Sequence, residues 1–428
     1  MFTNLNIHNW RQFERVEIAF HPRLTILTGP NGTGKTTLLH LLNRHWGWDL
    51  RFVSSPPSQE NGVAKYSSGF WTSEQNGNSQ GPPSTHATHD ENGRIIFKIG
   101  QIFFKNGRDE FLSVPKDVSD VFNVVIEQMV VVPGVYVPSH RPPYVHQTIK
   151  EIPASLDAKE QIFAVYLSEV ISRFTGSKNG IDNSGRIKSP SYYLKRSLMS
   201  LATFGYGNQA VDRNEEAVRI FEGFQDILRI MLPASLGFKR IRVRMPDVLF
   251  VTATGEFSID AVSGGIAAIV DMAWQIHMYA QIHDEFVVVI DEPEAHLHPQ
   301  LQQRLLPDML KAFPRCQFVI ATHNPLMVTS VPDSHIYALK YTADQKVESV
   351  LLDKVNLANS VDEILMDVLG VPYTMPTWAK NRIDAILEEF TTVPLTQDSM
   401  TTLKSKMTEL GMGQHFPGVL AKVAESQP

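Results

Sequence analysis

The chain has 428 residues, and this length predicts two or three lobes rather than one compact core. Its 45 acidic residues outnumber its 39 Lys and Arg residues. The net charge of −6 argues against a uniformly basic surface for nucleic acid but still allows a local basic patch. One cysteine, Cys316, excludes an intramolecular disulfide framework and indicates a reducing cytoplasm. No apolar stretch reaches the roughly 18 residues of a membrane span, so we expect a cytoplasmic chain without a membrane partner.

The first 28 residues predict three strands. Apolar residues alternate with polar ones over residues 5–7 and again over 16–20, which is typical of half-buried strands. The turn between them, residues 9–13, carries Arg11, which either contacts a phosphate or is a solvated turn residue. We favour the turn and keep Arg11 as a candidate nucleotide ligand. The apolar run Leu24–Thr28 predicts a buried strand.

A glycine-rich loop follows this strand. Residues 29–37, Gly-Pro-Asn-Gly-Thr-Gly-Lys-Thr-Thr, fit G-x-x-x-x-G-K-[ST], and a helical pattern comes next. In such a loop the backbone N–H groups and the helix start hold phosphates, Lys35 reaches the β- and γ-phosphates, and Thr36 ligates Mg²⁺. The candidate nucleotide ligands here are Asn31, Gly32, Thr33, Gly34, Lys35, Thr36 and Thr37.

The segment from 54 to 93 is rich in Ser, Pro, Gly, Asn and Gln, and predicts a long mobile insertion that buries little. Arg94–Ile99 and Gln101–Phe104 predict strands on either side of Gly100, with a turn at Asn106-Gly107. We expect these strands to form antiparallel sheet beside the nucleotide site.

A further buried strand is predicted from Val130–Val132 and Gly134–Pro138. The polar segment Ser139–Pro143 follows it. This segment either lines a site at the carboxyl end of the strand or is an ordinary turn with an exposed Arg141, and we give the two interpretations equal weight.

Residues 155–232 are mostly helical by their apolar spacing, with a loop from Thr175 to Pro190 and no sustained heptad pattern. The alternating run Lys239–Met245 predicts a strand with three arginines on one face. Such a face could hold a phosphate backbone or an acidic partner. We favour the plainer interpretation, a solvated outer face of a sheet. The three residues are Arg240, Arg242 and Arg244.

Three further motifs follow in order. Ser263, Gly264 and Gly265 precede a helix and predict a second phosphate-binding helix start. The apolar run Phe286–Ile290 predicts a strand buried on both faces, ending in Asp291 and Glu292.

At that strand end, Asp291 would hold Mg²⁺ and Glu292 would activate the attacking water. Two adjacent acids at a buried strand end are costly without a cation. A last apolar strand ends at His323, which could sense the γ-phosphate.

This order of motifs resembles that of ABC-type ATPases. Residues 291–299, Asp-Glu-Pro-Glu-Ala-His-Leu-His-Pro, with Ala321–Pro325 resemble the ATPase heads of the OLD, RecF, Rad50 and SMC-like group, especially the AAA_15/AAA_21 type. Residues 9–13 resemble the N-terminal element of that group. No Gln stands at the Q-loop position near Ser139. His298 occupies the D-loop position where transporters usually carry Asp, which favours this group over transporter ATPases.

The resemblance implies an α/β fold, a P-loop NTPase head with a mixed β-sheet core, an antiparallel β subdomain, an inserted helical lobe and C-terminal helices. We expect an N-terminal ATPase lobe over 1–145, the helical lobe over 146–237, a C-terminal ATPase lobe over 238–352 and a helical extension over 353–428. Helices are predicted there around Val361–Leu369, Trp378–Phe390 and Met400–Leu410.

The resemblance also implies a function. ATP and Mg²⁺ would bind between two copies of the chain, with Ser263 of one capping the ATP held by Lys35 of the other. Lys35, Glu292 and His323 would be catalytic.

Heads of this kind include ATPases of anti-phage systems such as Septu, which act with a separately encoded nuclease. The C-terminal region lacks an acid cluster of nuclease type. Alternatives are a DNA-binding repair ATPase like RecF or Rad50 and, less favoured, the ATP-binding subunit of an ABC transporter.

Overall fold

The computed structural model divides into two compact units, residues 1–359 and 360–428. None of the described helices is long and apolar enough to cross a membrane. The described residues are 1–48, 50–60, 63–71, 87–90, 93–116, 118–141, 144–151, 155–175, 188–352, 377–391, 396–411, 413, 416, 419–420 and 423.

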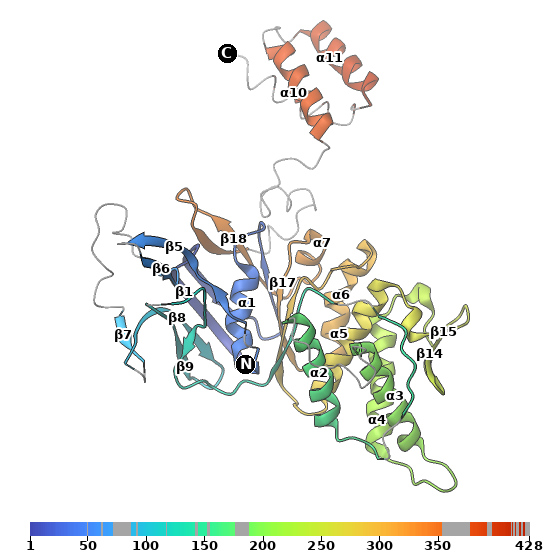
Figure 1. Cartoon of the computed structure of the whole chain (residues 1–428). Helices are drawn as coiled ribbons and strands as arrows, with labels where there is room; N and C mark the ends of the chain where they lie inside the picture. The colour runs from blue at the N-terminus through green and yellow to red at the C-terminus, as the bar shows by residue number, and fades with distance from the viewer. Residues whose placement is uncertain are drawn as a thin grey trace. The chain divides into compact units, whose positions relative to one another are not determined.

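The first unit is built on one mixed sheet, whose described part has 12 strands (Figure 1). In pairing order they are β11 (Val125–Ile126), β9 (Asp109–Pro115), β8 (Ile95–Phe104), β1 (Phe2–Trp10), β2 (Phe13–Ala19), β19 (Val347–Leu351), β18 (His335–Tyr341), β3 (Leu24–Thr28), β17 (Cys316–Ala321), β16 (Phe286–Asp291) and β12 (Gly134–Val137). The twelfth, β7 (Ala87–His89), pairs with β8 off this path. The predicted α/β fold with a mixed sheet is therefore confirmed.

The parallel half of the sheet forms its core. Strands β12, β16, β17, β3 and β18 run parallel, and every residue of β3, β16 and β17 is buried. Continuous apolar runs form such strands because helices or loops cover both faces of a parallel sheet. The carboxyl ends of these strands lie at one edge, and the loops that follow them carry the motifs. Strand β12 begins at Gly134, so the predicted strand over Val130–Val132 is not found.

The antiparallel half is the predicted sheet beside the nucleotide site. The alternation over residues 5–7 and 16–20 places Leu5, Ile7, Val16 and Ile18 in the core of the β1–β2 pair. The two strands predicted around Gly100 are one continuous strand, β8, with a register shift against β9 at that glycine. A Cβ at Gly100 would overlap the carbonyl of the neighbouring strand, which explains the glycine.

The insertion over 54–93 is more ordered than predicted where it is described. Strands β5 (Ser55–Glu60) and β6 (Val63–Ser67) pair antiparallel, and β4 (Phe52–Val53) pairs with β10 (Val121–Phe122). Ser68 is buried, and the Phe70 ring stacks on Phe97 with centroids 4.7 Å apart. Within residues 66–71 only Ser68 is buried, and aromatic side chains anchor this end of the segment to the sheet. The mobility predicted for the insertion stays a prediction.

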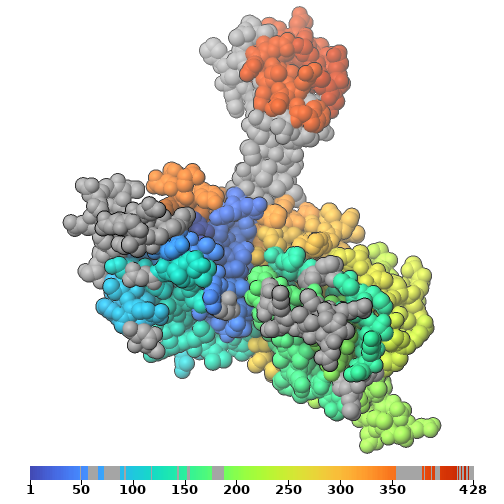
Figure 2. Space-filling view, in the orientation of Figure 1, coloured from blue at the N-terminus to red at the C-terminus, as the bar shows by residue number. Residues whose placement is uncertain are grey.

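The helices predicted over 155–232 follow; together with the elements up to Ala280, beyond the predicted bound of 237, we call them the helical lobe. Its elements are α2 (Lys159–Phe174), α3 (Pro190–Tyr206), α4 (Glu215–Met231), a small sheet of β13 (Arg240–Arg244), β14 (Asp247–Val251) and β15 (Glu256–Ser258), the turn η4 (Ile259–Ala261) and α5 (Gly264–Ala280). Ser189 caps α3 by accepting a hydrogen bond from the Tyr192 amide, and Asn214 caps α4 in the same way from Ala217. In Figure 2 this lobe, green to yellow, lies beside the blue N-terminal part of the chain.

The other described helices of the first unit include one that packs on the parallel strands. They are α1 (Lys35–Asn43), η1 (Arg44–Trp46), α6 (Pro299–Ala312) and α7 (Pro325–Val328), together with the 3₁₀ turn η3 (Ala234–Leu236). Helix α1 begins at the residue after the glycine-rich loop and packs on β16 and β17. This arrangement sets the loop directly over the carboxyl ends of those strands.

The second unit contains α10 (Thr377–Thr391) and α11 (Gln397–Glu409), close to two of the helices predicted there. Their apolar faces form a separate core around Leu403 and Met407. The capping box of α11, Thr396 with Ser399, fixes its start. The helix predicted over Val361–Leu369 lies outside the described residues.

Candidate nucleotide-binding site

Three of the predicted motifs meet at the carboxyl edge of the parallel strands. In the β-sheet register Asp291 pairs with Ala321, and Ala321 pairs with Leu27. The glycine-rich loop after β3, the acids at the end of β16 and His323 after β17 are therefore neighbours in space. Loops at this edge of an open α/β sheet are where such folds bind ligands.

The glycine-rich loop is shaped by its glycines. Gly29 and Gly34 have φ of +137° and +93°, which favour glycine, and a Cβ at Gly34 would overlap the Phe13 ring. The loop borders a cavity of about 290 Å³. Its lining residues are Gln12, Asn31, Gly32, Gly34, Lys35, Thr36, Thr37 and Glu292. Thr33 is buried outside this lining and donates its hydroxyl to the Pro30 carbonyl at 2.9 Å.

The Lys35 side chain bends back onto the loop. Its ammonium donates to the carbonyls of Gly29 at 2.8 Å and Pro30 at 3.1 Å. Burial lowers the pKa of Lys35, and the nearby carboxylates of Glu292 and Asp291 oppose this shift. The Lys35 ammonium is partly desolvated, and its acceptors here are neutral carbonyls. Charged phosphate oxygens bind an ammonium more strongly and would replace them.

Thr36 and Asp291 form the candidate metal site. The Thr36 hydroxyl donates to Asp291 Oδ2 at 2.9 Å, and Asp291 Oδ1 is buried without a hydrogen-bond partner among the described residues. Burial raises the pKa of Asp291 to about 6, and the Glu292 charge adds to the rise. A hydroxyl and a buried carboxylate with a free oxygen are ligands that Mg²⁺ prefers. These residues therefore fit a hard divalent cation.

Glu292 is aimed at His323. Its φ of +46° is unusual for a non-glycine residue, and His323 Nδ1 lies 2.7 Å from Glu292 Oε2. Half of the His323 side chain is exposed, so the pair faces the outside of the chain. A residue in the left-handed region keeps that conformation only when its surroundings hold it there.

Arg141 helps to keep Glu292 in this backbone conformation. Its guanidinium donates to the carbonyls of Asp291, Glu292 and Pro293 at 3.2–3.4 Å, and only 6% of the residue is exposed. Burial lowers the pKa of Arg141, while the nearby carboxylates of Asp271, Glu294 and Asp291 oppose the shift. Arg141 is therefore not the exposed turn residue of the second interpretation, and it contacts the backbone of the acids although it does not line the cavity. A role of this segment in lining the site stays a prediction.

Glu294 is a site residue that the sequence did not single out. It is buried, and the Thr322 hydroxyl donates to its Oε1. Burial, and then the Glu292 charge, raise the pKa of Glu294 well above its usual range. The sequence signal that could have identified Glu294 as a site residue is its position three residues after Asp291, in a turn between two motifs.

Gln12, and not the predicted Arg11, lines the cavity. Arg11 donates to the Val53 carbonyl at 3.1 Å and lies over the Phe52 ring, and it does not line the cavity. Gln12, its neighbour, does line it. Arg11 has φ of +54°, so the tight turn directs its side chain away from the loop. A phosphate contact by Arg11 stays a prediction.

The Ser263 motif begins a helix but lies outside the cavity. Ser263 is the N-cap of α5, is exposed, and makes no side-chain capping bond. A Cβ at Gly265 would approach the His296 carbonyl, so this helix start packs against the turn after Glu294. Gly264 and the amides around it are thus presented outward. Within one chain, these groups and Lys35 are not brought together.

The basic strand is only partly neutralised, because two of its three arginines share one carboxylate. Arg242 and Arg244 both pair with Glu256, and Arg240 is exposed. With Arg229 and α4, Arg240 and Arg242 line a cavity of about 530 Å³. The favoured solvated-face interpretation fits the ion pairs, and Arg240 remains available to an anion.

Two family models match the chain. The family described as "AAA domain" matches residues 4–107, which include the glycine-rich loop. The family described as "AAA domain, putative AbiEii toxin, Type IV TA system" matches residues 188–329, which include Ser263, Asp291 and His323. The two matches together contain every motif described above.

Two curated relatives are similar to parts of the chain. Septu protein PtuA from Bacillus thuringiensis is 27% identical over 161 residues, covering 34% of this chain and 40% of that protein. The Retron Vc95 probable ATPase from Vibrio cholerae serotype O1 biovar El Tor is 27% identical over 127 residues, covering 28% and 24%. The chain thus spans less than half the length of either relative.

Among solved structures, the SMC head domain from Thermotoga maritima aligns with a TM-score of 0.39 at 12% identity, over 82% of this chain and 99% of that one.

Proposed function

We infer that this chain, a P-loop ATPase of the OLD/SMC-like group, hydrolyses ATP with Mg²⁺ and does so as an ATP-bridged dimer. The observation that carries the inference is the convergence of Lys35, Thr36, Asp291, Glu292 and His323 at one strand edge. These residues supply a phosphate-binding cation, metal ligands, a candidate base and its partner, which are the parts that phosphoryl transfer to water needs.

Each side chain has a distinct task in this mechanism. Lys35 leaves the Gly29 and Pro30 carbonyls and binds the β- and γ-phosphates, whose charge is stronger than that of the carbonyls. Thr36 and Asp291 hold Mg²⁺, which when bound neutralises negative charge on the phosphates. Glu292 orients the attacking water and accepts its proton, and His323 holds the Glu292 carboxylate in place and reaches the γ-phosphate.

The exposed Ser263 supports the dimer. Within one chain this helix start is too far from the cavity to line it, yet its free hydroxyl and outward amides suit a phosphate. In a head-to-tail pair, Ser263 of one copy would complete the site around Lys35 of the other. ATP would then join the subunits and hydrolysis would release them, which couples chemistry to shape.

We place this ATPase in the cytoplasm, as the sensor or control subunit of an anti-phage complex with a separately encoded nuclease. The similarity to Septu protein PtuA and to the Retron Vc95 probable ATPase supports this placement. It remains a proposal because each match spans less than half of the relative.

A second candidate function is direct DNA binding, as in RecF-like or Rad50-like repair ATPases. The exposed Arg240 and the cavity it shares with Arg229 and Arg242 favour it. DNA binding of this kind would weaken steeply with salt, because cations are released from the phosphates.

Phosphate release from purified protein tests the ATPase. We expect hydrolysis that stops when EDTA removes Mg²⁺, and that stops in Lys35→Ala because the β- and γ-phosphates lose their cation. Lys340→Ala, on β18 and outside the cavity lining, is the matched control and should hydrolyse ATP normally. Unchanged turnover of Lys35→Ala at saturating ATP would show that the glycine-rich loop is not the catalytic site.

A further inference from the structure

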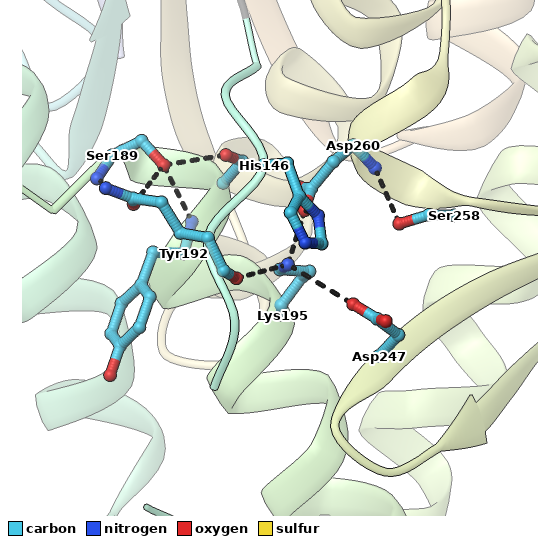
Figure 3. Close-up of polar contacts among 9 residues, drawn as sticks. His146, Ser189, Tyr192, Lys195, Asp247, Ser258 and Asp260 are labelled. Carbon is cyan, nitrogen blue, oxygen red and sulfur yellow. Dashed lines mark hydrogen bonds and ion pairs between the residues drawn. The ribbon is translucent and has the colours of Figure 1, made fainter. Parts of the chain in front are cut away.

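A buried lysine lies outside the catalytic cavity, near the start of α5 (Figure 3). Lys195 of α3 is fully buried, which is rare for lysine unless it is paired. Its ammonium donates to the Gln147 carbonyl at 2.6 Å and to Asp260 Oδ2, and it lies 3.8 Å from Asp247 Oδ1. Three segments that are distant in sequence therefore meet at one ammonium group.

Asp260 is the acceptor that matters most. It lies in the 3₁₀ turn η4, three residues before Ser263, and 2% of its side chain is exposed. His146 Nδ1 lies 3.1 Å from the same Oδ2, and the Asp260 amide contacts the Ser258 hydroxyl at 3.4 Å. The carboxylate is thus held from two sides, by α3 and by the segment after β12.

The segment after β12 is itself fixed. Gln147 accepts hydrogen bonds from the Ser189 amide and hydroxyl, both at 2.8 Å, and Ser189 is the N-cap of α3. Six residues earlier on the same segment, Arg141 holds the backbone carbonyls of Asp291 and Glu292. One stretch of chain therefore touches both the catalytic acids and the turn that precedes Ser263.

A metal site is the other interpretation of this cluster. His146, Asp247 and Asp260 each offer a ligand atom within 4.8 Å of the others. The Lys195 ammonium, however, contacts Asp260 and lies next to Asp247, so a positive charge already stands where a cation would bind. The geometry is that of a lysine held by acids, and it does not favour a metal.

Stability alone gives little reason for this arrangement. A buried ion pair is often no more stabilising than apolar side chains of the same volume, but it fixes the relative position of its two partners. Here the ion pair fixes Asp260 and with it η4, which sets the direction in which α5 begins. Ser263 itself makes no capping bond that would hold it.

We propose that Lys195 is a positioning residue that, through Asp260, holds the Ser263 helix start in the orientation needed to contact ATP on a second copy of the chain. This inference rests on the proposed ATP-bridged dimer. In this inference the Lys195–Asp260 ion pair of the helical lobe aligns the Ser263 helix start. Residues 144–147, which include the Gln147 carbonyl bound by Lys195, belong to the same stretch of chain as Arg141. Loss of the ion pair leaves Lys35 and its cavity intact and misaligns Ser263.

The test uses full-length Glu292→Gln, in which bound ATP is not turned over, as the background. Asp260→Asn keeps the side-chain size and removes the charge. We expect unchanged affinity for a fluorescent ATP analogue at low protein concentration, because Lys35 is untouched. We expect the protein concentration for half-maximal ATP-dependent dimerisation, measured by light scattering, to rise about tenfold or more, within the usual range of site coupling.

The matched control is Glu169→Gln, which removes a buried carboxylate of the same lobe that pairs with Arg173 and lacks contact with the turn before Ser263. It should leave the dimerisation midpoint unchanged. If Asp260→Asn does not fold, Lys195→Met with Asp260→Asn, which also removes the buried ammonium that Asp260→Asn leaves without its carboxylate, carries the same expectation. Circular dichroism shows which variants are folded.

The outcomes are distinct. A raised dimerisation midpoint with unchanged nucleotide affinity supports the inference, since a purely structural defect would weaken both. Normal ATP-dependent dimerisation of the folded Asp260 variants overturns it and leaves the proposed function standing. If Glu292→Gln alone binds ATP without forming an ATP-dependent dimer, the proposed function fails, and this inference fails with it.

Discussion

At the residue scale, the catalytic acids depend on how their backbone is held. Glu292 has a left-handed conformation, its amide donates to the Ala321 carbonyl at 2.9 Å, and its own carbonyl accepts from Arg141. Such a conformation costs on the order of 1–3 kcal/mol and persists only where neighbours enforce it. Arg141 therefore belongs to the site even though it is not placed on the phosphates.

The first prediction concerns this arginine. In Arg141→Lys a single ammonium replaces a fork that bonds three carbonyls, so Glu292 should lose its alignment with the water. We expect kcat to fall about 10–100-fold, the range seen when a reacting group is displaced by about 1 Å. ATP affinity should stay unchanged. Arg173→Lys, in α2, is the control, and equal kcat values for both variants would contradict the assigned role.

A buried histidine predicts acid sensitivity. His277 is fully buried, with Nε2 2.8 Å from the Ile220 carbonyl, and burial lowers its pKa to about 4. In the unfolded chain its pKa is 6.5, so below that pH the unfolded state binds the extra proton. Its contribution to stability is complete above pH 6.5 and falls as the pH drops toward 4.

The measurement is urea unfolding at pH 7.5 and pH 5. Between these values the histidine should account for a loss of about 2 kcal/mol in the free energy of unfolding, from the shift of its pKa. His277→Gln, which keeps a hydrogen-bonding group, should be less stable at pH 7.5 and lose less on acidification. An equal loss in both proteins would show that His277 is not the sensitive group.

At the scale of elements, the arginines of the basic strand β13 fall into two groups. Arg242 and Arg244 already pair with Glu256, whereas Arg240 is exposed. Replacing all three arginines with Gln should leave folding nearly unchanged, since surface substitutions usually cost within about 0.5 kcal/mol. We expect binding to DNA or to the partner protein to weaken, as measured by fluorescence anisotropy or co-purification. Unaltered binding of both would leave β13 with a solvating role only.

The elements also show what the sequence could predict. The glycine-rich loop, the acids after β16 and the strand before His323 were found from local patterns, because each is a contiguous run with one chemical meaning. The continuous strand β8 was predicted as two because Gly100 looked like a break, while the register shift there absorbs it. The anchoring of residues 66–71 by Phe70 and Trp71 was not predicted, because the surrounding polar segment hides these two aromatic residues.

Contacts between residues that are distant in the sequence could not be predicted from local patterns. Arg141 was left between two interpretations because a turn arginine gives no sign of the carbonyls it will meet, 150 residues away in Asp291. Arg11 was kept as a candidate ligand and Gln12 was not considered, yet Gln12 lines the cavity and Arg11, with its positive φ, does not. Glu294 and Lys195 acquire meaning only from three-dimensional neighbours.

At the scale of the whole molecule, the site is divided between two surfaces. Lys35, Thr36, Asp291 and Glu292 gather at one strand edge, and Ser263 stands apart, exposed and uncapped. In the proposed ATP-bridged dimer, a second copy would supply this helix start. The account therefore predicts that nucleotide state controls assembly.

Light scattering of Glu292→Gln with and without ATP tests this most directly. Glu292→Gln keeps the shape and the metal ligands but loses the base, so hydrolysis should fall by roughly 10²–10⁴-fold while ATP stays bound. We expect twice the 48.1 kDa mass of one chain when ATP is present, and one chain when it is absent. Adding Ser263→Arg should return the mass to one chain. The same mass in both conditions, with ATP bound and unaffected by Ser263→Arg, would contradict the ATP-bridged dimer.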